Sequence, residues 1–587
     1  MTANTPADRL AALRQRLTEA GVDGVLVPRS DEFLGEYVPE SGDRLAWLSG
    51  FTGSAGMAIV LMDRAAVFTD GRYTTQVAQQ TDAILWERHH ITDSPPTAWL
   101  RANAAGRRIG YDPWLHTEAA LARLAEAGVT LVPLAANPLD QAWADRPSAP
   151  ATPVEPHPLA HAGVDAATKR EAAAKILREA GQAAAVLADP HSIAWLLNIR
   201  GRDLPHTPLA LGFALLRADA SVALFLDPAR VGAEARSHLG NAVQVLPRDD
   251  LPAALAALTG KIVRLDADAT PAWFATSLRA AGATVATADD PCRLPRATKN
   301  LVEQAGTRAA HLRDAVALAR FLAWFAEAGP TGGQTEMSAA ARLLEERRRK
   351  PLFVAEAFPA IAGAGEHGAI VHYRATPESD RAIAANEVFL LDSGGQYRDG
   401  TTDVTRTVWT GPAAPPAELA DRYTRVLRGH VALATLRFPA GVAGPHLDAI
   451  ARRPLWDVAL DYDHGTGHGV GSFLSVHEGP VAFSRAAKIV PLQAGMILSD
   501  EPGFYLPGAY GIRIENLLLV RTDTGRFLGF ETLTLAPYDR RLIAVGLLTA
   551  DERAWVDGYH ARVLAEVGPL LDDAATAAWL RAACAPL

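Results

Sequence analysis

The chain has 587 residues, which is too long for one hydrophobic core and corresponds to about three or four domains of ordinary size. Its 49% of hydrophobic residues is typical of a globular protein, and its net charge of −9 argues against a nucleic-acid-binding function. Two cysteines are too few for a disulfide framework, and we find neither an apolar signal segment nor an apolar run of membrane-spanning length, so we expect a cytoplasmic protein that binds no nucleic acid and no membrane.

The first stretch of the chain predicts an α/β domain. Leucines at helical spacing predict an amphipathic helix that begins near Arg9 and stops at Gly21. Apolar runs predict strands at residues 25–27, 57–62 and 65–69. A second helix is expected to follow TDGRY at Thr69, so helices and strands alternate.

This helix–strand pattern occurs twice. The segment RLAALRQRLTEAGVDGVLV at Arg9 is similar to KREAAAKILREAGQAAAVL at Lys169, and Ala-Trp-Leu at Ala46 has a counterpart at Ala194. Because two copies are too few for a solenoid, the pattern indicates a duplicated domain. The proline-rich stretch at residues 145–159 predicts the linker between the copies.

A third unit begins near Arg296. A helical pattern covers residues 299–328, and Thr335 can cap a following helix. We expect the basic run at residues 347–350 to be the solvated end of that helix, where its charge complements the helix dipole. Near the end of the chain, TADE at Thr549 has the form of a capping box and predicts another helix.

Two aspartates lie in apolar strands that a turn connects. The run at residues 388–392 predicts a strand that ends at Asp392, and the run at residues 401–409 predicts its partner, which contains Asp403. A hairpin would bring these two side chains face to face. A single aspartate beside Ser-Gly-Gly is more often a turn cap, but two of them, with further candidate ligands downstream, favour a metal site.

Histidines follow in a glycine-rich segment. His464 and His468 are spaced like a helical zinc pair, but alternating glycines argue against a helix, and an extended backbone points both side chains to one face. His477 follows in VHEGP. A lone histidine is more often structural, yet glycines on both sides leave an imidazole unshielded.

Two glutamates complete the candidate set. Glu501 ends an apolar strand before a Pro-Gly turn, and Glu515 shares a strand face with Arg513. Arg513 then either forms a buried salt bridge with Glu515 or, if Glu515 bridges metals, supports the site or contacts substrate. Four carboxylates balance the charge of two divalent cations, and such a cluster is costly to bury without them. We therefore predict a site for two divalent cations made by Asp392, Asp403, His468, Glu501 and Glu515.

Ten short motifs along the chain carry a resemblance to a known family. They are GEYVP at Gly35, SGFTGSAG at Ser49, TDGRY at Thr69, AWLLNIRG at Ala194, VHYRAT at Val371, DSGGQYRDGTTDVTRT at Asp392, GTGHGVGSF at Gly465, VHEGP at Val476, DEPGFY at Asp500 and GIRIEN at Gly511. The chain resembles the Xaa-Pro aminopeptidases (aminopeptidase P) of peptidase family M24, in their longer three-domain cytosolic form, over essentially its whole length. Thr207 and Phe213 depart from the family pattern, outside the metal cluster.

The resemblance implies a fold that combines α/β and α+β architecture. Two related creatinase-N-type α/β domains are expected at residues 1–158 and 159–295. A C-terminal pita-bread catalytic domain is expected at residues 296–587. The family also suggests a homodimer.

The resemblance further implies how the metal ligands divide their work. Asp392 and Asp403 bind one ion, Asp403 also reaches the other, His468 and Glu501 complete the second, and Glu515 bridges both. An oxygen-rich shell with one imidazole suits Mn²⁺ best, with Co²⁺ or Zn²⁺ as alternatives.

The implied reaction releases the N-terminal residue from peptides that have proline in the second position. A hydroxide between the metals attacks the X-Pro bond, and Glu501 carries a proton to the leaving nitrogen, with catalytic help from His372 and His477. The implied substrate-binding residues are His372, His464, His477 and Arg513. Because an X-Pro bond has no N–H and a fixed φ, it calls for a dedicated pocket.

Three alternatives are weighed against this hypothesis. A prolidase shares the metal set and cuts only dipeptides, but that family lacks the second α/β domain. A creatinase-like hydrolase shares the fold and lacks the ligand set, and binding modules of the histone-chaperone kind have lost their ligands. All five candidate ligands are retained here, which favours a metalloexopeptidase.

Overall fold

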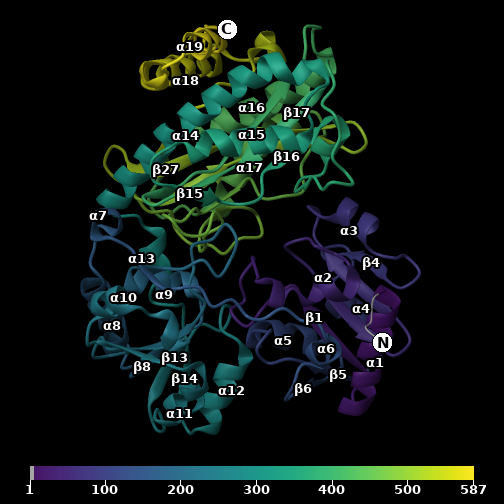
Figure 1. Cartoon of the computed structure of the whole chain (residues 1–587), viewed down its shortest axis with the longest axis vertical. Coiled ribbons are helices and arrows are strands. Elements are labelled where there is room, and N and C mark those ends of the chain that lie inside the picture. Colours follow the sequence, from purple (N-terminus) through teal and green to yellow (C-terminus); the bar gives the residue numbers. More distant parts are fainter. Residues whose placement is uncertain (1–4) are drawn as a thin grey trace. The chain divides into compact units, whose positions relative to one another are not determined.

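The computed structural model describes residues 5–587, which form two compact units (Figure 1). One unit comprises the residues up to Pro158 together with Val164–Arg293, and the other comprises Leu159–Gly163 and Leu294–Leu587. Among residues 5–587, none of the helices combines the length and the hydropathy that a membrane span requires. Most of the predicted linker is irregular, with one short strand, β7 (Glu155–Pro156).

Two six-stranded sheets form the first unit. The first has the strand order β4-β3-β2-β1-β5-β6, with β1 (Gly24–Pro28), β2 (Met57–Leu61), β3 (Ala65–Thr69), β4 (Glu87–His90), β5 (Arg108–Tyr111) and β6 (Thr130–Pro133). The second has the order β12-β11-β10-β8-β13-β14, with β8 (Ala184–Leu187), β10 (Phe213–Arg217), β11 (Val222–Phe225), β12 (Val243–Leu246), β13 (Ile262–Leu265) and β14 (Thr284–Thr287).

The two sheets repeat one topology. β1 pairs antiparallel with β2 and parallel with β5, and β8 pairs in the same two ways with β10 and β13. An amphipathic helix precedes each central strand, α1 (Pro6–Ala20) in the first copy and α8 (Ala166–Glu179) in the second. In α1 the leucines at helical spacing are buried, and Gly21 ends the helix with a φ of 67°. The predicted duplication of an α/β domain is confirmed.

The second unit surrounds short antiparallel sheets with helices. Its sheets include β16-β17-β20, β21-β28-β27-β24 and the hairpin β25-β26, where β21 is Phe438–Pro439. The strands used below are β16 (Ile361–Ala364), β17 (Val388–Ser393), β20 (Val404–Trp409), β24 (Ile497–Asp500), β25 (Gly503–Leu506), β26 (Tyr510–Arg513), β27 (Asn516–Thr522) and β28 (Phe527–Thr532). Figure 1 shows α14 (Leu301–Ala328), α15 (Glu336–Arg348) and α16 (Ala417–Ala434) alongside β16 and β17 of this unit.

The predicted helix starts of this unit are observed. Asn300 caps α14 (Leu301–Ala328), Thr335 caps α15 (Glu336–Arg348), and Thr549 forms a capping box with Glu552 at the start of α18 (Ala550–Val567). Each cap satisfies backbone N–H groups that the first helical turn leaves without partners.

The basic run at the end of α15 is not uniformly solvated, so that prediction is wrong for one residue. Arg348 is exposed, but Arg347 is only 1% exposed and donates two hydrogen bonds of 2.8 and 3.0 Å to Asp314 of α14. Its guanidinium also lies 3.3 Å from the carbonyls of Ser393 and Gly394. The helical period turns Arg347 toward the core, where a buried carboxylate compensates its charge.

Candidate metal centre

The first two candidate ligands come from one hairpin. Strands β17 and β20 are antiparallel, with Asp392 opposite Thr405, and Asp403 directly precedes β20. The predicted hairpin is therefore observed, and it brings both aspartates to the same end of the pair. Asp392 and Asp403 are 7% and 3% exposed.

The two glutamates come from a second antiparallel pair. Strands β24 and β27 place Asp500 opposite Asn516, so Glu501 directly follows one strand and Glu515 directly precedes the other. Thr405 joins this pair to the first hairpin: its carbonyl accepts from the Glu515 N–H at 3.2 Å, and its hydroxyl donates to Glu515 Oε2 at 2.7 Å.

His468 brings its imidazole to these carboxylates. Its Nε2 lies 3.6 Å from Asp403 Oδ2 and 3.4 Å from Glu501 Oε1, and one ligand atom each of Asp403, His468 and Glu515 lie within 4.8 Å of one another. Its Nδ1 lies 2.9 Å from the Gly469 carbonyl, an arrangement in which Nδ1 donates and the Nε2 lone pair faces the acidic groups.

The glycines beside His468 are needed for close backbone packing. The segment is extended, as predicted, with the short strand β22 (Gly467–His468). A Cβ on Gly467 would lie 1.9 Å from the Ser499 carbonyl oxygen. Only glycine therefore lets this segment approach β24 closely enough for His468 to reach Glu501.

Arg513 pairs with Asp392. Its Nη2 donates to Asp392 Oδ2 at 2.7 Å, its Nη1 donates to the Tyr505 hydroxyl at 2.7 Å, and its Nε lies 3.3 Å from the Thr405 hydroxyl. The guanidinium is 1% exposed. A role for Arg513 in substrate binding stays a prediction, since its observed partners are groups of the protein.

The cluster has unused acceptors of the kind that a divalent cation binds. Asp392 Oδ1, Asp403 Oδ1 and Glu515 Oε1 are buried and have no hydrogen-bond partner among the described residues. Burial raises the pKa of Asp403 and of Glu515 well above the usual values, and repulsion between these carboxylates adds to the rise. Burial likewise raises the pKa of Glu501 to about 7, against the lowering effect of Arg513. Carboxylate oxygens and one imidazole therefore fit divalent cations, which would neutralise the buried charge.

The predicted substrate-binding histidines have different surroundings. The His477 ring meets the His468 ring edge-on, with centroids 4.2 Å apart. His464 Nε2 lies 2.9 Å from the Tyr505 hydroxyl. His372 is half-buried in the loop that follows the short helix η5 (Gly365–Ala369). The individual roles of the predicted ligands and histidines stay predictions.

Two groups next to the cluster were not singled out by the sequence. The Tyr505 hydroxyl links His464 to Arg513, and Asp500 is fully buried with His430 Nδ1 3.1 Å from its Oδ2. Both residues lie in DEPGFY, one of the motifs that carry the family resemblance. His464 and His430 lie far from these two residues in the chain, so no local spacing identifies the contacts.

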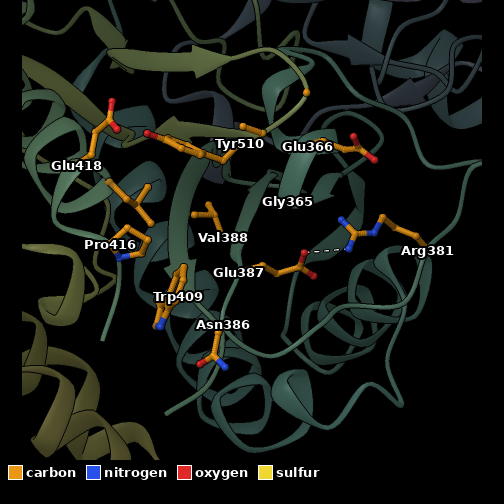
Figure 2. Close-up of a pocket in the computed structure, with 13 residues that line it drawn as sticks. Gly365, Glu366, Arg381, Asn386, Glu387, Val388, Trp409, Pro416, Glu418 and Tyr510 are labelled. Atoms are coloured by element: carbon orange, nitrogen blue, oxygen red, sulfur yellow. Dashed lines mark hydrogen bonds and ion pairs between the residues drawn. The ribbon is translucent and has the colours of Figure 1, made fainter. Parts of the chain in front are cut away.

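A pocket of about 550 Å³ lies at the opposite end of the same hairpin (Figure 2). Val388 and Trp409, which pair in register at that end, help to line it. Figure 2 shows Arg381 and Glu387, two of its lining residues, pointing toward each other, and Arg381 Nη2 lies 2.9 Å from Glu387 Oε2. This pocket is therefore separate from the cluster of candidate metal ligands.

Four segments of the chain match known protein families. Residues 9–140 and 145–303 each match a creatinase/prolidase N-terminal domain. Residues 305–522 match metallopeptidase family M24, and residues 526–587 match the C-terminal region of peptidase M24. These matches confirm two creatinase-type domains followed by an M24 catalytic domain.

Individual relatives extend over the whole chain. Aminopeptidase P2 of Arabidopsis thaliana is 38% identical, over 98% of this chain and 87% of its own. A solved X-prolyl aminopeptidase of Caenorhabditis elegans, described as a cytosolic enzyme with a di-nuclear active site, is 34% identical with a TM-score of 0.94 and covers both chains completely. The prolidase of Pyrococcus horikoshii is 24% identical with a TM-score of 0.51, which shows a shared fold over 64% of this chain and 100% of its own.

The expected enzyme class, a metalloexopeptidase, agrees with these relatives. Residues 305–522, which match the metallopeptidase family, contain all five candidate ligands. The chain belongs to the Xaa-Pro aminopeptidase (aminopeptidase P) family of M24 metallopeptidases.

Proposed function

We propose that this chain releases the N-terminal residue from peptides that have proline in the second position, with the help of two divalent cations. The observation that carries this proposal is the cluster of three buried, unpartnered carboxylate oxygens beside the His468 imidazole. Its occurrence in a chain that resembles Xaa-Pro aminopeptidases from end to end supplies the substrate class.

The two cations would be held by residues of the two strand pairs. Asp392 and Asp403 would hold one ion, His468 and Glu501 the other, and Asp403 and Glu515 would contact both. When bound, the cations would lower the pKa of a water molecule and polarise the carbonyl that is cleaved. We propose Mn²⁺ for both positions, because one imidazole among hard oxygen ligands suits that ion.

Glu501 would move the proton. Its Oε1 lies 3.1 Å from the Ser499 hydroxyl and 3.4 Å from His468 Nε2, so we assign the proton to Oε2. From this position the carboxylate would accept a proton from the attacking water and pass it to the proline nitrogen. That nitrogen must be protonated before it can leave.

The three histidines would bind the peptide around the reacting bond. His477 and His372 would donate to substrate carbonyl oxygens and stabilise charge that develops there. His464, held by Tyr505, would help to form the proline pocket. Arg513 would orient Asp392 through its hydrogen bond, while anchoring of the peptide beyond the proline would need a change in its buried surroundings.

The test is hydrolysis of Arg-Pro-Pro by the Mn²⁺-loaded protein. We expect free arginine and Pro-Pro, with no arginine from the matched peptide Arg-Ala-Pro. Cleavage of X-Pro dipeptides alone would overturn the proposal in favour of a prolidase. The second creatinase-type domain, at residues 145–303, argues for the aminopeptidase, since the prolidase likeness leaves about a third of the chain unaccounted for.

Quaternary structure and location are proposed on the same family basis. We propose a homodimer, which light scattering of the purified protein would test. We also propose a cytoplasmic location, which fractionation of the source cells would test.

A further inference from the structure

One buried glutamate contacts the segment that carries His372. Glu336 is the first residue of α15, and its side chain is completely buried. A carboxylate in such a place is costly unless hydrogen-bond donors surround it. The identity of these donors indicates what Glu336 does.

Three donors converge on the Glu336 carboxylate. The Ala364 N–H donates at 2.8 Å, His367 Nδ1 lies 2.9 and 3.0 Å from the two oxygens, and the Tyr373 hydroxyl donates at 2.8 Å. Ala364 and His367 precede His372 in the chain, and Tyr373 directly follows it. Glu336 therefore fixes the chain on both sides of His372.

The same segment rests against the strand that leads to the metal cluster. A Cβ added to Gly511 would lie 1.7 Å from the Gly368 carbonyl oxygen, so η5 and β26 are in direct backbone contact. β26 ends at Arg513, and Glu515 follows two residues later. The segment is thus held between the first turn of α15 and β26, and a shift of either support would move His372 relative to the cluster.

We infer that Glu336 is a positioning residue, which acts through His367 and Tyr373 to hold His372 where it contacts the peptide. This inference rests on the proposed function, in which His372 donates to a substrate carbonyl. Glu336 is fully buried and does not touch the substrate itself. Its loss leaves buried donors without their acceptor, and loss of such orienting partners typically lowers activity roughly 10- to 100-fold.

The test is a double-mutant cycle between Glu336 and His372 on the Mn²⁺-loaded full chain. E336Q keeps the side-chain volume, and we expect kcat/KM for Arg-Pro-Pro to fall about 10- to 100-fold with two metal ions still bound. In the H372A background, E336Q should change kcat/KM less than about threefold, because the group that it positions is absent. Y373F removes one of the donors and should follow the same non-additive pattern with a smaller loss.

A neighbouring carboxylate provides the matched control. Glu366 is exposed at the rim of the pocket in Figure 2, one residue before His367, and E366Q should leave kcat/KM unchanged. Wild-type activity in E336Q, additive effects of E336Q and H372A, or loss of metal from E336Q would each overturn the inference. If E336Q does not fold, the cycle of Y373F with H372A decides. Failure of the proposed function is a separate result, in which the wild-type chain releases no arginine.

Discussion

Arg513 donates a 2.7 Å hydrogen bond to Oδ2 of Asp392, and Oδ1 of the same carboxylate has no hydrogen-bond partner in the described chain. The protein therefore fixes one oxygen of this carboxylate, and in the proposed metal site the other oxygen would bind a cation. The second Nη of Arg513 donates to the Tyr505 hydroxyl at 2.7 Å, so a single planar group orients both neighbours. We infer from this arrangement that Arg513 supports the proposed metal site.

The first prediction concerns the shape of that guanidinium. R513K keeps the positive charge, but a lysine ammonium cannot make both bonds from the same position. We expect kcat/KM for Arg-Pro-Pro to fall about 10- to 100-fold, as it does when partners of metal ligands are lost. Steady-state kinetics at saturating Mn²⁺ measures the effect. R526K, at an exposed arginine, is the control, and equal activity of R513K and R526K would contradict the prediction.

The second prediction concerns the carboxylate that would bridge the two ions. E515Q removes one negative charge of the four that balance two divalent cations, while Thr405 can still donate to the amide oxygen. We expect fewer than two ions per chain by elemental analysis and activity below about 1% of wild type. E531Q is the control, since Glu531 lies in β28 and pairs with Arg308. Two retained ions with full activity in E515Q would exclude a bridging role.

The third prediction follows from the raised pKa of Glu501 in the metal-free protein. Burial raises this pKa to about 7, whereas the unfolded chain has a value of about 4.3. A carboxyl group whose pKa is raised by folding stabilises the fold fully when the pH is below its unfolded-state pKa. That stabilisation is lost as the pH rises through its folded-state pKa. Bound cations remove the effect because they hold the carboxylate in its ionised form.

Thermal unfolding with EDTA and with Mn²⁺ measures this linkage. We expect the Tm difference between metal-loaded and chelated protein to be larger at pH 8 than at pH 6. E501Q lacks the titrating group, so its chelated form should have a Tm that depends less on pH in this range. Equal Tm differences at both pH values in the wild-type protein would contradict the prediction.

The sequence predicted the elements that local patterns encode. The hairpin of Asp392 and Asp403 follows from two apolar runs and a turn, and the duplicated sheet from two similar helix–strand segments. Long-range polar partners have no such pattern. Tyr505 contacts His464, which lies 41 residues earlier in the chain, and Glu336 contacts Tyr373, 37 residues later. These pairs depend on how the elements pack, which a single sequence does not report.

Arg347 is the clearest case of this limit, and it leads to the last prediction. A basic run at a helix end is usually solvated, yet Arg347 and Asp314 are 1% and 2% exposed and hydrogen-bonded to each other. The Tyr397 hydroxyl also donates to Asp314, at 2.9 Å. This network lies against Ser393, the residue after Asp392.

Removal of the Arg347 charge alone should lower the free energy of unfolding far more than replacement of Arg347, Asp314 and Tyr397 together. R347M leaves the Asp314 carboxylate buried without its cation, and we expect a loss of about 3–5 kcal/mol in the free energy of unfolding. R348M, at the exposed neighbour, should stay within about 0.5 kcal/mol of wild type. The triple variant R347M/D314L/Y397F replaces the network by apolar side chains and should recover most of the stability lost in R347M. Urea unfolding followed by circular dichroism gives the free energy of unfolding of the wild type, R347M, R348M and the triple variant. A triple variant no more stable than R347M would contradict the prediction and would mean that the shape of the side chains, and not charge pairing, dominates at this position.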